Sequence, residues 1–128
     1  MKEHCAFCQI INNEKQRILA QNRLAFAIRD GYPVSEGHVL IIPCRHAGSF
    51  FGISSDERKA LFELLDKVKI EIDKQYSPDA YNIGINDGME AGQTLQHLHI
   101  HLIPRYQGDI DDPRGGIRWL FPHKAKYW

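Results

Sequence analysis

The chain has 128 residues, of which 43% are hydrophobic and 25% are charged, so it can form one domain with a core but not two ordinary ones. Its 16 Lys and Arg residues balance its 16 Asp and Glu residues. The resulting net charge of zero excludes an overall field that would draw the chain to nucleic acid or to a membrane surface, so neither is an expected partner.

The N-terminal stretch MKEHCAFCQIINNEKQ carries charges and amides throughout, and it lacks the continuous apolar segment of a signal peptide. No apolar run approaches the length that crosses a bilayer. The three cysteines, an odd number without a secretion signal, do not indicate a disulfide framework. We therefore expect a cytoplasmic protein.

The first third of the chain predicts a short helix and three strands. Residues 7–13 can form the helix, and the apolar segments 17–22 and 23–30 are typical of a hairpin. The Gly, Pro, Ser and Asp of DGYPVSEG predict a loop over 30–37. The aliphatic run HVLIIP over 38–43 predicts a buried strand that its final proline ends.

A long helix is predicted between two recognisable boundaries. Ser54 and Glu57 have the spacing of a capping box, and Pro78 follows the expected end. Apolar residues recur between them at helical spacing, namely Leu61, Leu64, Leu65, Val68 and Ile72. We expect this helix to run from Ser55 to Tyr76.

The last part of the chain predicts two more strands around a loop. AYNIGIN alternates like a strand over 80–86, DGMEAGQ over 87–93 has loop composition, and QHLHIHLIP over 96–104 alternates again. Residues 105–128 then form a C-terminal extension rich in Asp, Gly and Pro. The elements together predict an α+β fold, a mostly antiparallel five-stranded sheet with one long and one or two short helices.

Three histidines, His97, His99 and His101, occupy alternate positions of the last predicted strand. Because successive strand side chains point to opposite faces, the three imidazoles should share one face, while Leu98 and Ile100 anchor the strand in the core. Three surface histidines are one alternative interpretation. A metal site with one or two of them as ligands is another, although parallel side chains of one strand do not converge well enough for all three to bind one ion.

The motif HLHIHLI resembles the signature of the histidine triad superfamily of nucleotide hydrolases and transferases, in which three histidines alternate with apolar residues. EGHVLIIP, followed by a basic residue and His46, is similar to that family's central strand. INDGMEAGQT before the triad and PRY after it resemble the branch of diadenosine polyphosphate hydrolases that includes the fragile-histidine-triad protein. The resemblance covers residues 5–106 and implies a single histidine triad domain over 1–128, with 105–128 as its extension.

The resemblance implies a two-step transfer in which His99 attacks the α-phosphate of a nucleotide and forms a nucleotidyl-histidine intermediate. His101 would hydrogen-bond the phosphate oxygens and, if protonated, stabilise the developing charge, and Gln93 would lie near the bridging or leaving oxygen. The second ring nitrogen of His99 should donate to a backbone carbonyl and so fix the attacking tautomer. For Gln93, a loop amide that caps its own turn is the alternative.

Four further residues match positions at which the family contacts the nucleotide. Gly92 would let the backbone approach the phosphate, and Thr94 would add a hydroxyl to the backbone N–H groups there. Asn86 would lie at the phosphate or ribose, and the Asp30 carboxylate would accept from two ribose hydroxyls. The alternatives are a structural loop amide for Asn86 and a turn aspartate for Asp30.

Cys5-x-x-Cys8 is half of a tetrahedral zinc site, although a redox pair is also possible. Many triad proteins carry this motif, and the related galactose-1-phosphate uridylyltransferases bind zinc through an equivalent quartet. The resemblance implies His46 and His97 as the other two ligands. Such a closed four-ligand Zn²⁺ site would be structural, because it leaves no open position for chemistry.

The resemblance favours a homodimeric enzyme that hydrolyses dinucleoside polyphosphates at the α-phosphate, binds a purine nucleotide and needs no organic cofactor. Hydrolysis of nucleoside phosphoramidates is the chief alternative within the family, and phosphorolysis or nucleotidyl transfer would use the same intermediate. Outside the family, we consider a metal-dependent hydrolase with His97 and His101 as catalytic ligands, and a nucleotide-binding or partner-binding module without chemistry.

Several residues have two open interpretations. Four apolar residues either line a base pocket or belong to the core, namely Phe7, Ile10, Phe26 and Ile28. Three cations either reach distal phosphates or, as we favour, are solvated surface charges, namely Arg105, Arg114 and Arg118. His38 and His123 carry no motif and are interpreted as structural.

Overall fold

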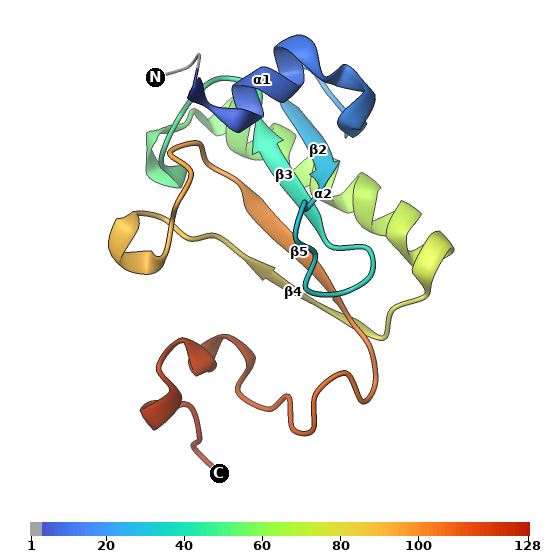
Figure 1. The fold of residues 1–128 in the computed structure, drawn as a ribbon, viewed down its shortest axis with the longest axis vertical. Helices are drawn as coiled ribbons and strands as arrows, with labels where there is room; N and C mark the ends of the chain where they lie inside the picture. Colours follow the sequence, from blue (N-terminus) through green and yellow to red (C-terminus); the bar gives the residue numbers. More distant parts are fainter. Residues whose placement is uncertain (1–3) are drawn as a thin grey trace.

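The computed structural model describes residues 4–128, which form one five-stranded sheet with helices packed on it (Figure 1). The strand order is β1-β2-β3-β5-β4, and every neighbouring pair is antiparallel. The strands are β1 (Ile18–Gln21), β2 (Ala25–Arg29), β3 (Val39–Pro43), β4 (Ala80–Gly84) and β5 (Ile100–Arg105), and the α-helices are α1 (Ala6–Asn13) and α2 (Ser55–Tyr76). The predicted α+β fold is confirmed. None of the described helices is long and apolar enough to span a membrane.

The sheet has a separate apolar cluster on each face, because strand side chains alternate between faces. The larger cluster packs the apolar side of α2 on Ala25, Ala27, Val39, Ile41, Ile100 and Leu102. The smaller cluster joins α1 to the other face through Phe7, Ile10, Phe26, Ile28, Leu40 and Ile42. The four apolar residues with two open interpretations therefore belong to the core, since each is at most 4% exposed.

The last strand begins later than predicted, at Ile100 instead of residue 96. β3 and β5 pair only from Ile41 opposite Ile100 to Val39 opposite Leu102. β3 ends at Pro43, whose ring leaves no backbone N–H to continue the ladder. The prediction that one continuous strand carries all three histidines is therefore wrong, because His97 and His99 precede β5.

The helix α2 begins and ends at the predicted residues. The Ser54 hydroxyl accepts from the Glu57 N–H (3.1 Å), and the Glu57 carboxylate accepts from the Ser54 N–H (2.9 Å). This reciprocal pair is the capping box that the sequence predicts. At the other end, Ser77 adopts a left-handed conformation with φ of 50°, which stops the helix before Pro78.

Glu57 also fixes the segment that follows β3. Arg45 donates to both carboxylate oxygens of Glu57 at 3.0 and 2.9 Å, and the carboxylate is almost fully buried. The hydrogen bonds from Arg45 hold the pKa of Glu57 at about 2, against burial, which would raise it. One carboxylate thus joins the start of α2 to the loop that carries His46.

Replacing Glu57 with Gln should lower the free energy of unfolding by about 1–3 kcal/mol at pH 7, because it weakens the cap and removes a charge-assisted pair. The pKa of Glu57 is lower in the folded state, so its contribution is complete above the usual carboxyl range and is lost as the pH falls toward 2. Urea unfolding at pH 7 and pH 3 measures this loss. Glu63→Gln, on the exposed side of α2, is the matched control.

Candidate functional site

His99 is held in one tautomer by the backbone beside it. Its Nδ1 lies 2.9 Å from the carbonyl oxygen of His97. A carbonyl oxygen only accepts, so Nδ1 carries the proton and Nε2 keeps its lone pair. The expected contact with a backbone carbonyl is confirmed, and it leaves Nε2 of His99 as a nucleophilic atom.

His101 is held by a second histidine that the sequence analysis interpreted as structural. Nε2 of His38 lies 3.0 Å from Nδ1 of His101, and Nδ1 of His38 accepts from the Val34 N–H at 3.2 Å. Because a backbone N–H only donates, neutral His38 carries its proton on Nε2 and donates it to His101. Neutral His101 then carries its own proton on Nε2, from which it can donate.

Burial lowers the pKa of both His38 and His101, and the nearby imidazoles lower the pKa of His101 further. The Asp30 carboxylate acts in the opposite direction on both rings. Burial is the larger effect, so both rings are neutral near pH 7. His101 therefore acts as a hydrogen-bond donor through its tautomer, without needing a positive charge.

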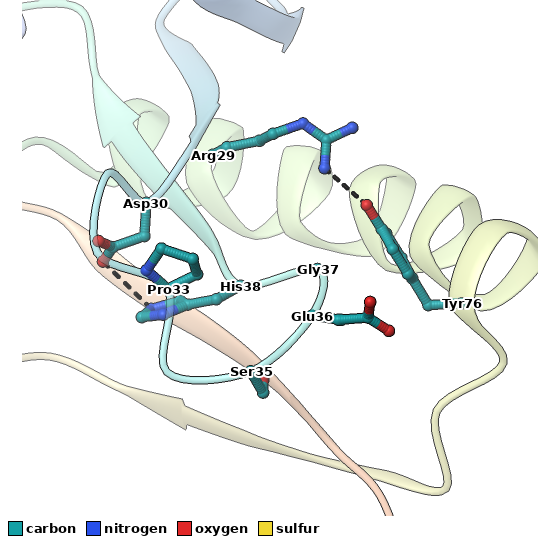
Figure 2. Close-up of a pocket in the computed structure, with 8 residues that line it drawn as sticks. All are labelled: Arg29, Asp30, Pro33, Ser35, Glu36, Gly37, His38 and Tyr76. Carbon is teal, nitrogen blue, oxygen red and sulfur yellow. Dashed lines mark hydrogen bonds and ion pairs between the residues drawn. The ribbon is translucent and has the colours of Figure 1, made fainter.

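Asp30, the residue after β2, contacts both His38 and His101. Its Oδ2 lies 3.3 Å from Nε2 of His38 and 3.9 Å from Nδ1 of His101, while Oδ1 accepts from the Tyr32 N–H at 2.8 Å. Figure 2 shows the Asp30 carboxylate turned toward the His38 ring across the loop. Asp30 therefore makes the contact of a turn aspartate and also orients the two histidines, while its contact with a ribose stays a prediction.

The loop from β2 to β3 keeps His38 in place. Ser35 donates to the Pro104 carbonyl and Tyr106 donates to the Glu36 carbonyl, each at 2.7 Å. Gly37 has φ of 88°, and a Cβ there would come within 2.9 Å of the Tyr76 ring, so only glycine fits without a shift. The same loop borders a cavity of about 430 Å³ between Asp30 and Tyr76 (Figure 2).

The glycine-containing loop before the triad is braced by Gln93. Its amide nitrogen donates to the carbonyls of Gly48 (2.8 Å) and Leu95 (2.9 Å), and its amide oxygen accepts from the Gly88 N–H (2.8 Å). Gln93 is 6% exposed. These contacts match the loop-capping alternative for Gln93, and its position at a leaving oxygen stays a prediction.

Beside this amide the loop is open. Gly92 has φ of 97°, which favours glycine, and a Cβ there would meet no atom within 4 Å. Thr94, two residues later, is exposed, and Asn86, just before the loop, is half-buried. The N–H groups of Gly92 and Gln93 donate to the carbonyls of Met89 (2.9 Å) and Gly88 (3.1 Å), so an anion in this open space would be bound by Thr94.

The four predicted metal ligands form one cluster. The ligand atoms of Cys5, Cys8, His46 and His97 all lie within 4.8 Å of one another. Cys5 Sγ lies 3.3 Å from His97 Nδ1, and Cys8 Sγ lies 3.3 Å from His46 Nδ1 and 3.6 Å from His97 Nδ1. Donor atoms of a tetrahedral zinc site lie roughly 3.3–3.8 Å apart, so the geometry fits such an ion.

The tautomer of His97 also fits a metal. Its Nε2 donates to the Pro43 carbonyl at 2.8 Å, so Nδ1 is unprotonated and points its lone pair at the two cysteines. Burial lowers the pKa of His97 and keeps the ring neutral. Cys44, although close in sequence to His46, is not part of the cluster.

A second group, Asp30, His38 and His101, has the residue types of a metal site but not its tautomers. Nε2 of His38 faces the other two residues, and it bears the proton because Nδ1 accepts from Val34. A protonated nitrogen cannot bind a metal. His97 therefore belongs to a group of residues that can bind a metal, whereas His101 belongs to a group whose histidines share a hydrogen bond. This arrangement argues against a metal-dependent hydrolase in which His97 and His101 bind the same catalytic ion.

The family model of the HIT domain matches residues 12–108, and the chain therefore belongs to the histidine triad (HIT) family. The chain is 38% identical over 96 residues to a bis(5'-nucleosyl)-tetraphosphatase of Schizosaccharomyces pombe, covering 75% of this chain and 53% of that protein. It is 34% identical to an adenosine 5'-monophosphoramidase of the same organism, covering 79% and 74%. The family includes nucleotide-processing enzymes of both kinds.

Among solved structures, the fold is similar to that of a zinc-bound histidine triad family protein from Mycobacterium smegmatis. The TM-score is 0.77 at 27% identity, and the match covers 85% of this chain and 80% of the other. A metal ion is thus present in one protein of the same fold, and the Cys5, Cys8, His46 and His97 cluster is able to bind one here.

Proposed function

We propose that this chain is a nucleotide hydrolase that works through a covalent intermediate on His99. The observation that carries the proposal is the hydrogen bond from His99 Nδ1 to the His97 carbonyl, which leaves Nε2 free to attack. Nε2 forms a bond to the α-phosphorus as the bond from phosphorus to the leaving group breaks. Neutral His101 donates a hydrogen bond from Nε2–H to the leaving atom or to a phosphate oxygen and keeps its proton, so a polyphosphate leaves as the anion.

In the second step, water attacks the phosphorus and loses a proton to the solvent, and the nucleoside monophosphate leaves as the bond to His99 breaks. Thr94 binds the phosphate oxygens beside the open position of Gly92, and Gln93 holds that loop rigid. Asp30 and Asn86 are the residues that we assign to the ribose and the phosphate. Because the Asp30 carboxylate also contacts His38, a ribose bound to Asp30 would affect the hydrogen bond from His38 that sets the tautomer of His101.

Dinucleoside polyphosphates are the substrate class that we propose first, on the AGQT and PRY flanks and on the similarity to the S. pombe tetraphosphatase. Phosphoramidates are the second candidate. Two observations favour them, the similarity to the S. pombe monophosphoramidase and the donor tautomer of His101, which can place a hydrogen bond on the leaving nitrogen.

We assign the four-residue cluster to a structural zinc ion that joins the N-terminal segment to the sheet. Bound zinc would supply a fixed charge and a rigid crosslink there, with no reactive position. Phe7, between the two cysteines, contacts the rings of both His97 and His99 edge-on, with centroids 5.6 and 5.2 Å apart. Through Phe7, the zinc site would thereby help to hold the His99 ring in position.

We also propose a cytoplasmic homodimer. β4 is an edge strand of the sheet, and its Ile83 is 52% exposed. An open strand edge with an apolar residue is a surface that pairing with a second copy would cover. We treat residues 1–128 as one domain, in which the segment after Arg105 is an extension.

Replacing His38 with Gln should lower kcat about tenfold to a hundredfold with little change in KM, because His101 loses the donor that sets its tautomer. Steady-state kinetics on the variant measure this split. Nitrogen NMR of the imidazoles should show the proton of His101 moving from Nε2. A loss of activity that appears only in KM would contradict this positioning role.

Product analysis by chromatography tests the proposed function. With diadenosine tetraphosphate, the proposal predicts adenosine monophosphate and adenosine triphosphate, with or without inorganic phosphate. Adenosine diphosphate that appears only with added phosphate would indicate a phosphorylase instead. Cleavage of an adenosine phosphoramidate alone would favour the second substrate class, and no product from either substrate would contradict the proposal.

A further inference from the structure

The last residues of the chain form a compact unit, which we call the C-terminal lobe (residues 113–128). Arg118 donates to the carbonyls of Ala125 (2.9 Å) and Lys124 (2.6 Å), and Trp119 Nε1 donates to the Arg114 carbonyl (2.8 Å). Ala125 is fully buried. Figure 1 shows this segment beyond β4, at the end of the molecule opposite α1.

The three arginines with two open interpretations all have local partners, and Arg114 and Arg118 are exposed, as the surface-charge interpretation expects. Arg105 donates to both oxygens of Asp109 (2.8 Å each) and to Asn82 (2.6 Å). Arg114 pairs in the same two-pronged way with Asp112 and lies over the Trp128 ring. Together with the backbone contacts of Arg118, these bonds commit all three guanidinium groups to local structure.

A cavity of about 640 Å³ lies between the C-terminal lobe and the sheet. The sheet contributes Ile103, and the lobe contributes Ile117, Trp119 and Leu120. His101 also lines it, and the rings of His101 and His99 are 5.2 Å apart. One end of the cavity therefore lies next to the proposed nucleophile.

The charge of the cavity indicates what it can hold. Among the described residues that line it, Arg105 has the only guanidinium or ammonium group, and Asp109 neutralises that group. A chain of phosphates would need cations that this wall does not offer. Isoleucine, leucine and tryptophan side chains instead favour an uncharged, flat ring, which buries apolar surface against them.

We propose that this cavity is a leaving-group subsite that binds an uncharged planar ring carried by the part of the substrate beyond the scissile bond. The inference rests on the proposed function, since it requires attack by His99. Two sources could supply such a ring, the distal base of a dinucleoside polyphosphate or an aromatic amine in a phosphoramidate. The C-terminal lobe then selects substrates by their leaving group.

Two matched pairs of substrates test the subsite. Diadenosine tetraphosphate and adenosine tetraphosphate differ only in the distal adenosine, and the benzylamine and methylamine amidates of adenosine monophosphate differ in the aromatic ring. The proposal predicts that kcat/KM is higher for the ring-bearing member of at least one pair by about tenfold, which is the factor given by about 1.4 kcal/mol of binding. The pair that shows the preference identifies the source of the ring.

Ile117→Asp places a charge on the cavity wall and should remove this preference. Phe121→Asp is the matched control, because Phe121 is an exposed apolar residue of the same lobe outside the cavity lining. Equal kcat/KM within both pairs, or a preference that survives Ile117→Asp, would overturn the subsite. If none of the four substrates is cleaved, the proposed function fails.

An NMR titration with indole then tests the cavity without any reaction. The proposal predicts that indole shifts the methyl resonances of Ile117 and Leu120, and unchanged resonances would overturn the subsite.

Discussion

Replacing His99 with Ala should lower kcat/KM on the order of 10⁴–10⁶-fold, the range found when the nucleophile of a covalent enzyme is removed. The variant loses the atom that forms the bond to phosphorus, so the covalent intermediate cannot form. His101 and the loop around Gly92 remain, so nucleotide binding should change only a fewfold. Kinetics and calorimetric titration with a nucleoside monophosphate measure the two effects separately.

His123→Ala is the control for this variant, because His123 is exposed on the C-terminal lobe. It should keep full activity. Activity within tenfold of the parent protein in His99→Ala would eliminate the covalent mechanism. A parallel loss of nucleotide binding would instead mean that the substitution had disturbed the site as a whole.

The second large effect concerns the metal cluster. Replacing Cys8 with Ser should abolish binding of one zinc ion per chain and lower stability by about 4 kcal/mol when free zinc is a thousandfold above its dissociation constant. In a chain of this size, that loss corresponds to about 10–20 °C in melting temperature. Elemental analysis and thermal unfolding, with and without a chelator, measure both quantities.

Cys44→Ser is the matched control, since Cys44 is half-buried but lies outside the cluster. It should retain zinc and respond to the chelator like the parent protein. Cobalt in place of zinc should give the absorption bands of a tetrahedral site with two sulfur ligands. Equal zinc content in Cys8→Ser and Cys44→Ser would show that the cluster is not the metal site.

The sequence was most informative where local patterns determine structure. The capping box and apolar spacing predicted α2 to the residue, because helix boundaries depend on nearby side chains. Cys5-x-x-Cys8 indicated only half of the metal cluster. Its other half, His46 and His97, came from the resemblance to the family, because no local spacing relates residues so far apart in the chain.

The main omission was His38, and its cause is strand register. Leu40 pairs with His101 across β3 and β5, so His38, two residues before Leu40, lies on the same face as His101. This relation depends on which strands pair and at which residues, and no single segment reveals it. A histidine at the start of the segment that resembles the family's central strand was the available signal.

Two other features needed three-dimensional information. The extent of the last strand depends on Pro43 of its neighbour, which ends the hydrogen-bond ladder before His99. The C-terminal lobe has no apolar periodicity, and it is held by Arg118 through backbone carbonyls, so its composition predicted only an extension. The subsite beside His101 could not be anticipated without it.

The most direct test of the account is to trap the covalent intermediate. The protein is mixed with diadenosine tetraphosphate or an adenosine phosphoramidate, quenched in alkali to preserve a bond between phosphorus and nitrogen, and measured by intact and fragment mass spectrometry. The account predicts an added adenosine monophosphoryl group, located on His99. Turnover without any adduct during the steady state, or an adduct on another residue, would contradict it.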